Sequence, residues 1–192
     1  MKEKSGWYTT AELAVMGAFG AILFFSVFIL GSAILIATGI PATGGVATML
    51  VAVFIIVAGA KIVDKFGAST IMLGIAGIIA IPTLSWGPPG LQKVPMVMVM
   101  GLIIDIAVLM FKRENKGYII GGAMAGLVAP ILNYWVLIIV GLPGADKLQP
   151  LLIPLSVVFT ILAAIGAYLG TIAYDRKLSK LSVVRNLKSK SS

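Results

Sequence analysis

Long apolar runs separated by short connections constrain this chain more than any other feature of its sequence. Several runs reach the roughly 20 residues that a helix needs to cross a hydrocarbon core of about 30 Å. Hydrophobic residues make up 59% of the 192 positions and charged residues 11%, against about 25% charged in soluble domains. We therefore predict an all-α integral membrane protein with six transmembrane helices. The predicted spans are Ala11–Ala37, Gly45–Ala60, Ala68–Trp86, Pro95–Phe111, Tyr118–Val140 and Leu151–Tyr174.

The connections between these spans are short and rich in glycine, proline and charge. The longest, Gly141–Pro150, has ten residues, which leaves no room for a soluble domain. We predict one membrane domain over residues 1–176 and a basic cytoplasmic tail over residues 177–192.

The cations lie almost entirely on one side of the predicted spans. Thirteen Lys and Arg side chains fall on the side of the two termini, against Lys93 and Lys147 on the other. The positive-inside rule then places both termini in the cytoplasm of a cell-membrane protein. The net charge of +8 thus reflects topology, and we expect no nucleic-acid partner. The tail, with Leu178, Leu181, Val184 and Leu187 on one helical face, could lie on the anionic inner leaflet or remain solvated.

Several kinds of chemistry are excluded by composition. The chain contains no Cys and no His, which removes thiolate and imidazole nucleophiles and metal ligands. Its seven Asp and Glu residues offer no two-metal cluster within one span. We expect no enzyme activity, no cofactor and no metal site.

Asp105 is the only carboxylate that the sequence places deep inside a span. It lies about ten residues, or about 15 Å, from the outer end of the fourth predicted helix. An unpaired carboxylate at that depth costs several kcal/mol. Asp105 should therefore face a polar cavity or ligand, or be satisfied by neighbouring hydroxyl groups.

Asn133, Tyr134 and Trp135 form the second candidate for recognition. They follow Pro130, which frees the carbonyl of Gly126 within the fifth span. An amide between two large rings suits a flat heteroaromatic ligand, although an interfacial aromatic pair with an interhelical amide bond explains the same residues.

The outer connections could cover such a ligand. Thr38–Gly45 and Gly87–Lys93 are rich in Gly and Pro and could act as lids. Trp86 falls at the outer interface beside the second lid, as aromatic belt residues do.

Two local patterns lie in and around the first span. Thr9 and Glu12 have the spacing of a capping box, which favours a structural role for Glu12. Ala14 and Ala18 have the small-xxx-small spacing that lets helices approach closely in lipid, and we predict that they contact a partner. For the similar pairs in the last two spans we predict packing inside the protein; these are Gly122 with Gly126, Ala163 with Ala167, and Gly166 with Gly170.

The length, the six spans and the Ala14-x-x-x-Ala18 motif resemble the substrate-binding S components of energy-coupling factor (ECF) transporters. The resemblance implies a membrane-embedded subunit that binds a water-soluble vitamin for an ATP-driven importer. It implies partners as well, a transmembrane coupling protein that docks at Ala14 and Ala18 and two ATPase subunits. Substrate would bind near the outer side among the last three helices.

The stretch Gly87–Val108 resembles thiamin-type S components. Thiamin or its pyrimidine precursor is therefore the expected substrate, with Asp105, Asn133, Tyr134, Trp135 and Trp86 as binding residues. Two other readings remain open: a self-contained small transporter or channel that uses Asp105 as a proton or cation relay, and a purely structural subunit of a membrane complex.

The predicted topology is testable by thiol labelling, because the chain has no cysteine of its own. Lys116→Cys and Ser189→Cys should react only with reagent on the cytoplasmic side, since the positive-inside rule places them there. Gln92→Cys and Asp146→Cys should react only from outside. External labelling of Ser189→Cys would overturn the six-helix topology.

Overall fold

The computed structural model describes residues 8–38, 41–142, 145–182 and 184–185 of the chain. Leu187 of the predicted tail face and Ser189 of the labelling experiment lie outside these ranges. The helices are α1 (Thr10–Thr38), α2 (Pro41–Val63), α3 (Ala68–Ala80), α4 (Lys93–Met110), α5 (Asn115–Ile139), the 3-10 helix η1 (Ala145–Leu151), α6 (Leu152–Arg176) and the 3-10 helix η2 (Leu178–Lys180).

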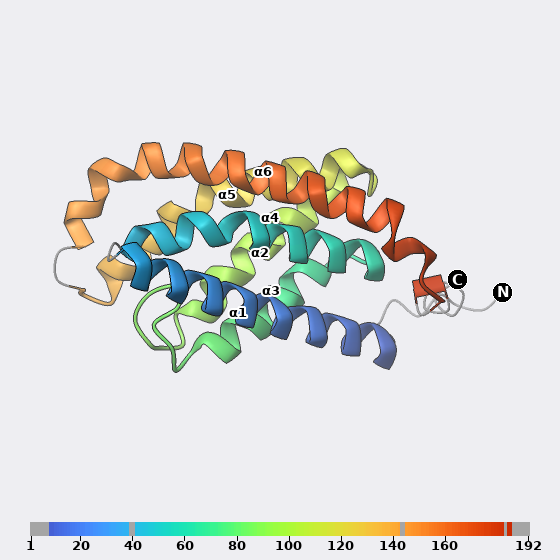
Figure 1. Cartoon of the computed structure of the whole chain (residues 1–192), viewed down its shortest axis with the longest axis horizontal. Coiled ribbons are helices and arrows are strands. Elements are labelled where there is room, and N and C mark those ends of the chain that lie inside the picture. The colour runs from blue at the N-terminus through green and yellow to red at the C-terminus, as the bar shows by residue number, and fades with distance from the viewer. Residues whose placement is uncertain (1–7, 39–40, 143–144, 183, 186–192) are drawn as a thin grey trace.

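These elements confirm an all-helical, multi-pass membrane protein. Five helices are long and apolar enough to cross a membrane, and α3 is a shorter apolar helix. Successive helices run in opposite directions, so that the start of α1 and the end of α6 lie at the same end of the bundle (Figure 1). We call this the proximal end, and the opposite one the distal end.

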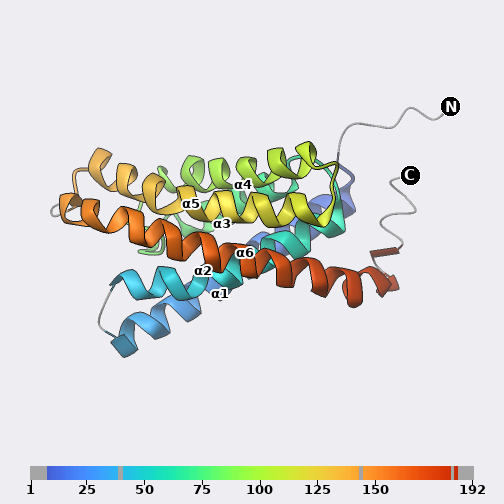
Figure 2. The ribbon, with the colours of Figure 1, turned by 90° about the horizontal axis from the view of Figure 1, so that it is seen from above.

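The six α-helices form a closed ring of neighbours. In the order α1, α2, α6, α5, α4, α3, each helix packs against the next, and α3 packs against α1. The view from above shows α6 between α5 and α2 (Figure 2). Since α2 also contacts α3 and α5 across this ring, it is the most deeply buried of the five long helices.

Small residues bring the helices of this ring into close contact. A Cβ atom on Gly126 of α5 would lie 2.6 Å from the Phe159 carbonyl oxygen of α6, and one on Gly170 of α6 would lie 2.9 Å from the Phe54 carbonyl oxygen of α2. Ala163 and Ala167 are fully buried. The prediction that the small pairs of the last two spans pack inside the protein is confirmed, since Gly122 and Gly166 meet α6 and α2 in the same way.

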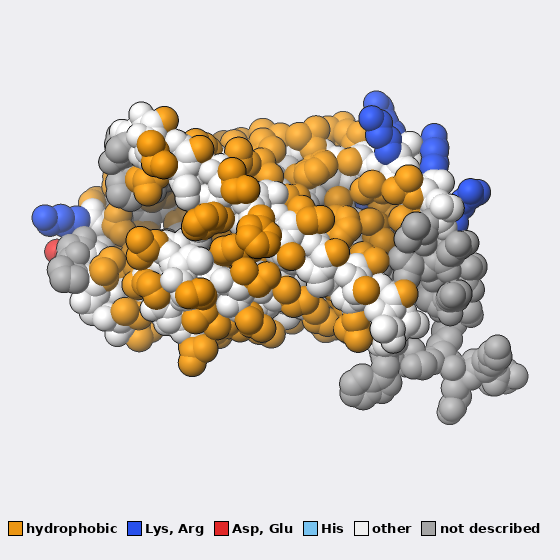
Figure 3. Space-filling model, turned by 60° about the horizontal axis from the view of Figure 1, so that its bottom comes forward, with side chains coloured by type: hydrophobic (Ala, Val, Ile, Leu, Met, Phe, Trp, Pro, Cys, Tyr) orange, Lys and Arg blue, Asp and Glu red, His pale blue; other side chains and the backbone are white. Residues whose placement is uncertain are grey.

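The surface carries a broad apolar band with cations at its two ends (Figure 3). Two described cations, Lys93 and Lys147, belong to the distal end. The proximal end carries nine: Lys61, Lys65, Lys112, Arg113, Lys116, Arg176, Lys177, Lys180 and Arg185. This asymmetry matches the charge pattern from which the cytoplasmic position of the termini was predicted.

The third predicted span, Ala68–Trp86, is wrong in its extent. The helix ends at Ala80, and its 13 residues cover about 20 Å. Pro82 has no N–H with which to continue the hydrogen-bond ladder. Ile81 and Thr83 instead donate to carbonyls three residues earlier, at 3.2 and 3.0 Å. Residues 81–92, which we call the distal loop, lead from α3 to α4.

The first predicted lid, Thr38–Gly45, is not a loop. Thr38 is the last residue of α1, and α2 begins at Pro41 and includes Gly45. Proline favours the first turn of a helix because its missing N–H would have no partner there. Of the two predicted lids, the described structure therefore retains one, as part of the distal loop.

The start of the basic tail packs against the bundle instead of presenting one apolar face. Val184 is buried beside Ile62 and Tyr174, whereas Leu181 is 51% exposed. Of the predicted apolar face, Leu178 and Val184 therefore pack against the protein, whereas Leu181 points away from it.

Candidate functional site

Asp105 binds the N-terminus of α3. The residue that precedes this helix, Gly67, has no side chain with which to cap it. The Asp105 carboxylate, on α4, accepts hydrogen bonds from the Ser69 N–H at 3.1 Å, the Thr70 N–H at 2.9 Å and the Thr70 hydroxyl at 2.6 Å. It thereby satisfies two of the orphan N–H groups of α3 and places negative charge at the positive end of the helix dipole.

This contact matches the alternative in which neighbouring groups satisfy the carboxylate. The structure also separates Asp105 from the other predicted binding residues. Where α4 and α5 cross, a Cβ on Gly121 would lie 3.0 Å from the Cα of Ile104. Asn133 is twelve residues further along α5 (133 minus 121), about 18 Å away along the helix axis. One small ligand cannot bridge that distance as the sequence analysis expected.

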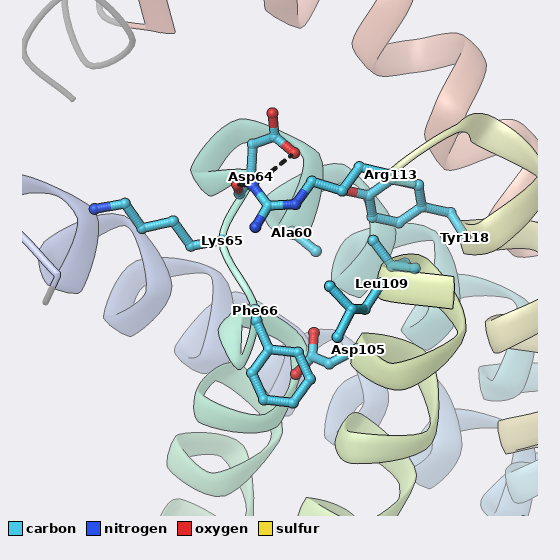
Figure 4. Close-up of a pocket in the computed structure, with 9 residues that line it drawn as sticks. Ala60, Asp64, Lys65, Phe66, Asp105, Leu109, Arg113 and Tyr118 are labelled. Atoms are coloured by element: carbon cyan, nitrogen blue, oxygen red, sulfur yellow. Dashed lines mark hydrogen bonds and ion pairs between the residues drawn. The ribbon is translucent and has the colours of Figure 1, made fainter. Parts of the chain in front are cut away.

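A small pocket lies beside Asp105 at the proximal end. It is lined by the α2–α3 and α4–α5 connections and by Tyr118 (Figure 4). Its cations are engaged: Arg113 binds the backbone carbonyl of Asp64 and lies 3.8 Å from its carboxylate, and Lys65 lies 2.8 Å from Glu12. The arrangement joins loops by paired charges.

The start of α1 is joined to the same connection. The Thr9 N–H donates to the Glu12 carboxylate at 2.7 Å and the Glu12 N–H to the Thr9 hydroxyl at 3.3 Å, so the predicted capping box is confirmed. The Tyr8 hydroxyl donates to the Phe66 carbonyl. Burial raises the pKa of the Tyr8 phenol above its usual value, so this group keeps the proton that it donates.

Lys61 forms a second polar cluster, which the sequence analysis did not find. Its ammonium contacts the Asp175 carboxylate at 2.8 Å and the Asn115 side-chain oxygen at 2.5 Å, and lies 4.8 Å from the centre of the Tyr174 ring. The cluster connects α2, α5 and α6. Because the members of this cluster are far apart in the sequence, no local sequence pattern predicts the cluster.

Lys93 caps the other end of α3. The sequence analysis placed it in an external loop, but it is the first residue of α4 and is fully buried. Its ammonium donates to the carbonyls of Ala80 at 2.9 Å and Thr83 at 2.5 Å. A cation at the C-terminus of α3 complements the helix dipole, so side chains of α4 bind both ends of α3.

At the distal end, the distal loop brings Trp86 to α1 and Gly87 to Asn133 of α5. The Trp86 ring packs edge-on against Phe24 of α1, with ring centres 6.5 Å apart. A Cβ on the next residue, Gly87, would lie 3.6 Å from the Asn133 side-chain oxygen. Trp86 and Gly87 have φ values of 60° and 108°, a strained conformation for Trp that is commonest at functional sites.

The Asn133 side-chain oxygen is buried and accepts no hydrogen bond from the described residues. Burying a carbonyl oxygen without a donor costs about 1–3 kcal/mol, and each such group in a native protein requires an explanation. A ligand N–H or O–H group at this oxygen provides one. Asn133, Trp86 and the backbone of Gly87 form what we call the distal cluster.

Tyr134 and Trp135 form an aromatic pair, with ring centres 5.9 Å apart. The Trp135 side chain is 56% exposed, so it faces away from the core of the bundle. This geometry is that of an interfacial aromatic pair, the alternative left open above.

Ala14 and Ala18 are exposed on the outward face of α1. Between them, a Cβ on Gly17 would have no neighbour within 4 Å. The first turns of α1 thus present a shallow strip of small residues that the protein itself does not cover.

Comparisons with protein-family models, curated proteins and solved structures find no match for this chain.

The role of Asp105 as a cap predicts a loss of stability in Asp105→Asn. The amide offers one carbonyl oxygen where the carboxylate offers two, so the free energy of unfolding should fall by about 1–3 kcal/mol. Denaturant titration in detergent micelles measures it. Asp146→Asn is the control, because this carboxylate is exposed at the distal end. Equal stability of both variants would contradict the capping role.

Proposed function

We propose that this protein is the substrate-binding S component of an ECF-type importer for a water-soluble vitamin or vitamin precursor. The observation that carries the proposal is the exposure of Ala14 and Ala18. The small pairs of the last two spans are used inside the bundle, whereas this pair is left on its surface.

Exposed small residues are informative in a bilayer. Lipid tails are as apolar as leucine, so helices associate there through close packing, which small residues permit. The strip of Ala14, Gly17 and Ala18 can receive a helix of a transmembrane coupling protein. It lies in the proximal part of α1, which the positive-inside rule places near the cytoplasm, the side on which two ATPase subunits would act.

The distal cluster is the proposed substrate site. It offers a partly buried indole at Trp86 and an unsatisfied amide oxygen at Asn133. An aromatic surface with a few polar groups suits a small heteroaromatic ligand. Thiamin or its pyrimidine remains the proposed substrate. Because Asp105 is engaged at α3, the charge of thiamin would be recognised by aromatic rings through cation–π interaction.

One observation favours a second candidate, a self-contained transporter that uses Asp105 as a relay. Asp105 lines the proximal pocket, from which a proton or cation could reach it. This mechanism requires the carboxylate to exchange the three hydrogen bonds that it makes to α3. Purification from native membranes separates the candidates: ATPase subunits should accompany an S component and be missing for a self-contained transporter.

The docking proposal predicts different results for two alanine positions. Ala18→Leu should abolish coupled uptake and leave folding and ligand binding intact, because the added side chain fills the outward strip. Ala167→Leu is the matched control, since Ala167 is fully buried between helices and overpacking there costs about 1–3 kcal/mol. Uptake assays measure the loss of coupled transport, and thermal unfolding measures the loss of stability, in both variants. Retained uptake in Ala18→Leu would contradict docking at this strip.

The substrate proposal predicts that Asn133→Leu weakens thiamin or pyrimidine binding by about 1–3 kcal/mol, roughly 5- to 150-fold. The change keeps side-chain size and removes the amide that bonds the ligand. Trp135→Ala should leave the affinity unchanged, because that ring faces outward. Isothermal titration calorimetry on the purified variants measures both. If neither compound binds the wild type, the substrate assignment is wrong while the docking proposal can stand.

A further inference from the structure

Lys93 is an unusual residue for its position. Its side chain is fully buried, yet in the described part of the chain no carboxylate forms an ion pair with it. Its recorded partners are the backbone carbonyls of Ala80 and Thr83. Burying an ammonium group is costly unless its hydrogen bonds are satisfied, so this contact indicates a specific role for the charge.

We propose that Lys93 is a positioning residue that holds the distal loop closed, with Trp86 against Phe24 and Gly87 against Asn133. Its two acceptors lie on either side of the point where α3 ends and the loop begins. The other end of the loop leads directly into Lys93 itself. One ammonium group therefore joins the start of the loop to the residue that follows its end.

A backbone contact completes the closure. The Gly90 N–H donates to the Ile81 carbonyl at 3.0 Å. This bond joins the two ends of the loop next to Ala80, whose carbonyl accepts a hydrogen bond from the Lys93 ammonium. With its base fixed, the loop carries Trp86 onto Phe24 and Gly87 onto Asn133. Lys93 thus acts on the distal cluster through the backbone, without contacting it.

The spacing along α4 supports this assignment. Lys93 and Asp105 are twelve residues apart (105 minus 93), about 18 Å on a helix, and the 13 residues of α3 span about 20 Å. The antiparallel α4 thus presents an anion to the N-terminus of α3 and a cation to its C-terminus. Each charge matches the helix dipole, which fixes α3 and the base of the loop relative to α4.

The contact bears on ligand access. The backbone of Gly87 is close enough to Asn133 that a Cβ there would touch its side-chain oxygen. A ligand that approaches the oxygen from this side must displace the loop. This consequence rests on the proposed function, whereas the positioning of the loop by Lys93 does not.

The first experiment uses Ala80→Cys as a reporter in a chain that has no other cysteine. Ala80 is fully buried at the end of α3, so maleimide reaches it only when the region around the base of the loop opens. Adding Lys93→Met should raise the labelling rate about tenfold or more, since opening no longer breaks charge-assisted hydrogen bonds. Lys147→Met is the control, because Lys147 is the other distal lysine and is exposed. Equal rates in both backgrounds overturn the proposal.

A second measurement needs no variant, in case Lys93→Met does not fold. The folded wild-type protein is acetylated in detergent for increasing times, and modification is followed by mass spectrometry. Lys93 should react at least about tenfold more slowly than Lys147 if opening of the loop limits its exposure. Similar rates for the two lysines overturn the proposal.

Adding thiamin to the acetylation separates this proposal from the proposed substrate. Slower acetylation of Lys93 with thiamin supports both, because a ligand that binds the closed form stabilises it. Slow acetylation that thiamin does not change supports the positioning role and removes thiamin as the ligand of the distal cluster.

Discussion

The backbone groups at the two ends of α3 are the constraint on which the arrangement of this protein depends. A helix of 13 residues is about 20 Å long, so in a hydrocarbon core of about 30 Å at least one of its ends lies away from water. Unsatisfied N–H and C=O groups are costly there. Asp105 and Lys93 satisfy groups at both ends, which requires α4 to lie antiparallel to α3 and in one register.

The two ends of the molecule that this register defines differ in their chemistry. At the proximal end, Glu12, Lys65, Arg113 and Asp64 join the connections in pairs, and Asp105 caps α3 beside them. These charges stabilise the fold and leave little for ligand chemistry. The distal end holds fewer charges, a strained Trp86 backbone and an Asn133 oxygen without a donor. The groups that we propose for recognition therefore lie where charge is scarce.

The sequence predicted the features that depend on local order. Apolar length defined the long helices, and the three-residue spacing of Thr9 and Glu12 defined a capping box that the structure contains. The short α3 was not predicted, because an apolar run continues past Ala80 and conceals the effect of Pro82. The start of this helix was predicted correctly at Ala68, but its contact with Asp105 depends on how α3 packs against α4, which no local pattern records.

The distal cluster and Lys93 could not be predicted for a different reason. Asn133 lies beside Gly87, 46 residues earlier in the chain (133 minus 87), because of the way α5 packs against the distal loop. A single sequence does not indicate how two such distant segments are aligned. Lys93 follows a Gly- and Pro-rich segment and so resembles a solvated loop residue. Its burial depends on the two carbonyls that the end of α3 presents to it.

The position of α3 also relates the proposed docking strip to the distal loop. α3 packs against α1 so closely that a Cβ on Gly20 would lie 2.7 Å from the Met72 carbonyl oxygen. Gly20 lies two residues beyond Ala18 and is on the side of α1 that faces the bundle. Close-packed interfaces transmit displacement because they cannot be compressed. A partner helix that shifted α1 would therefore move α3, and with it the residues that Lys93 holds at the base of the distal loop.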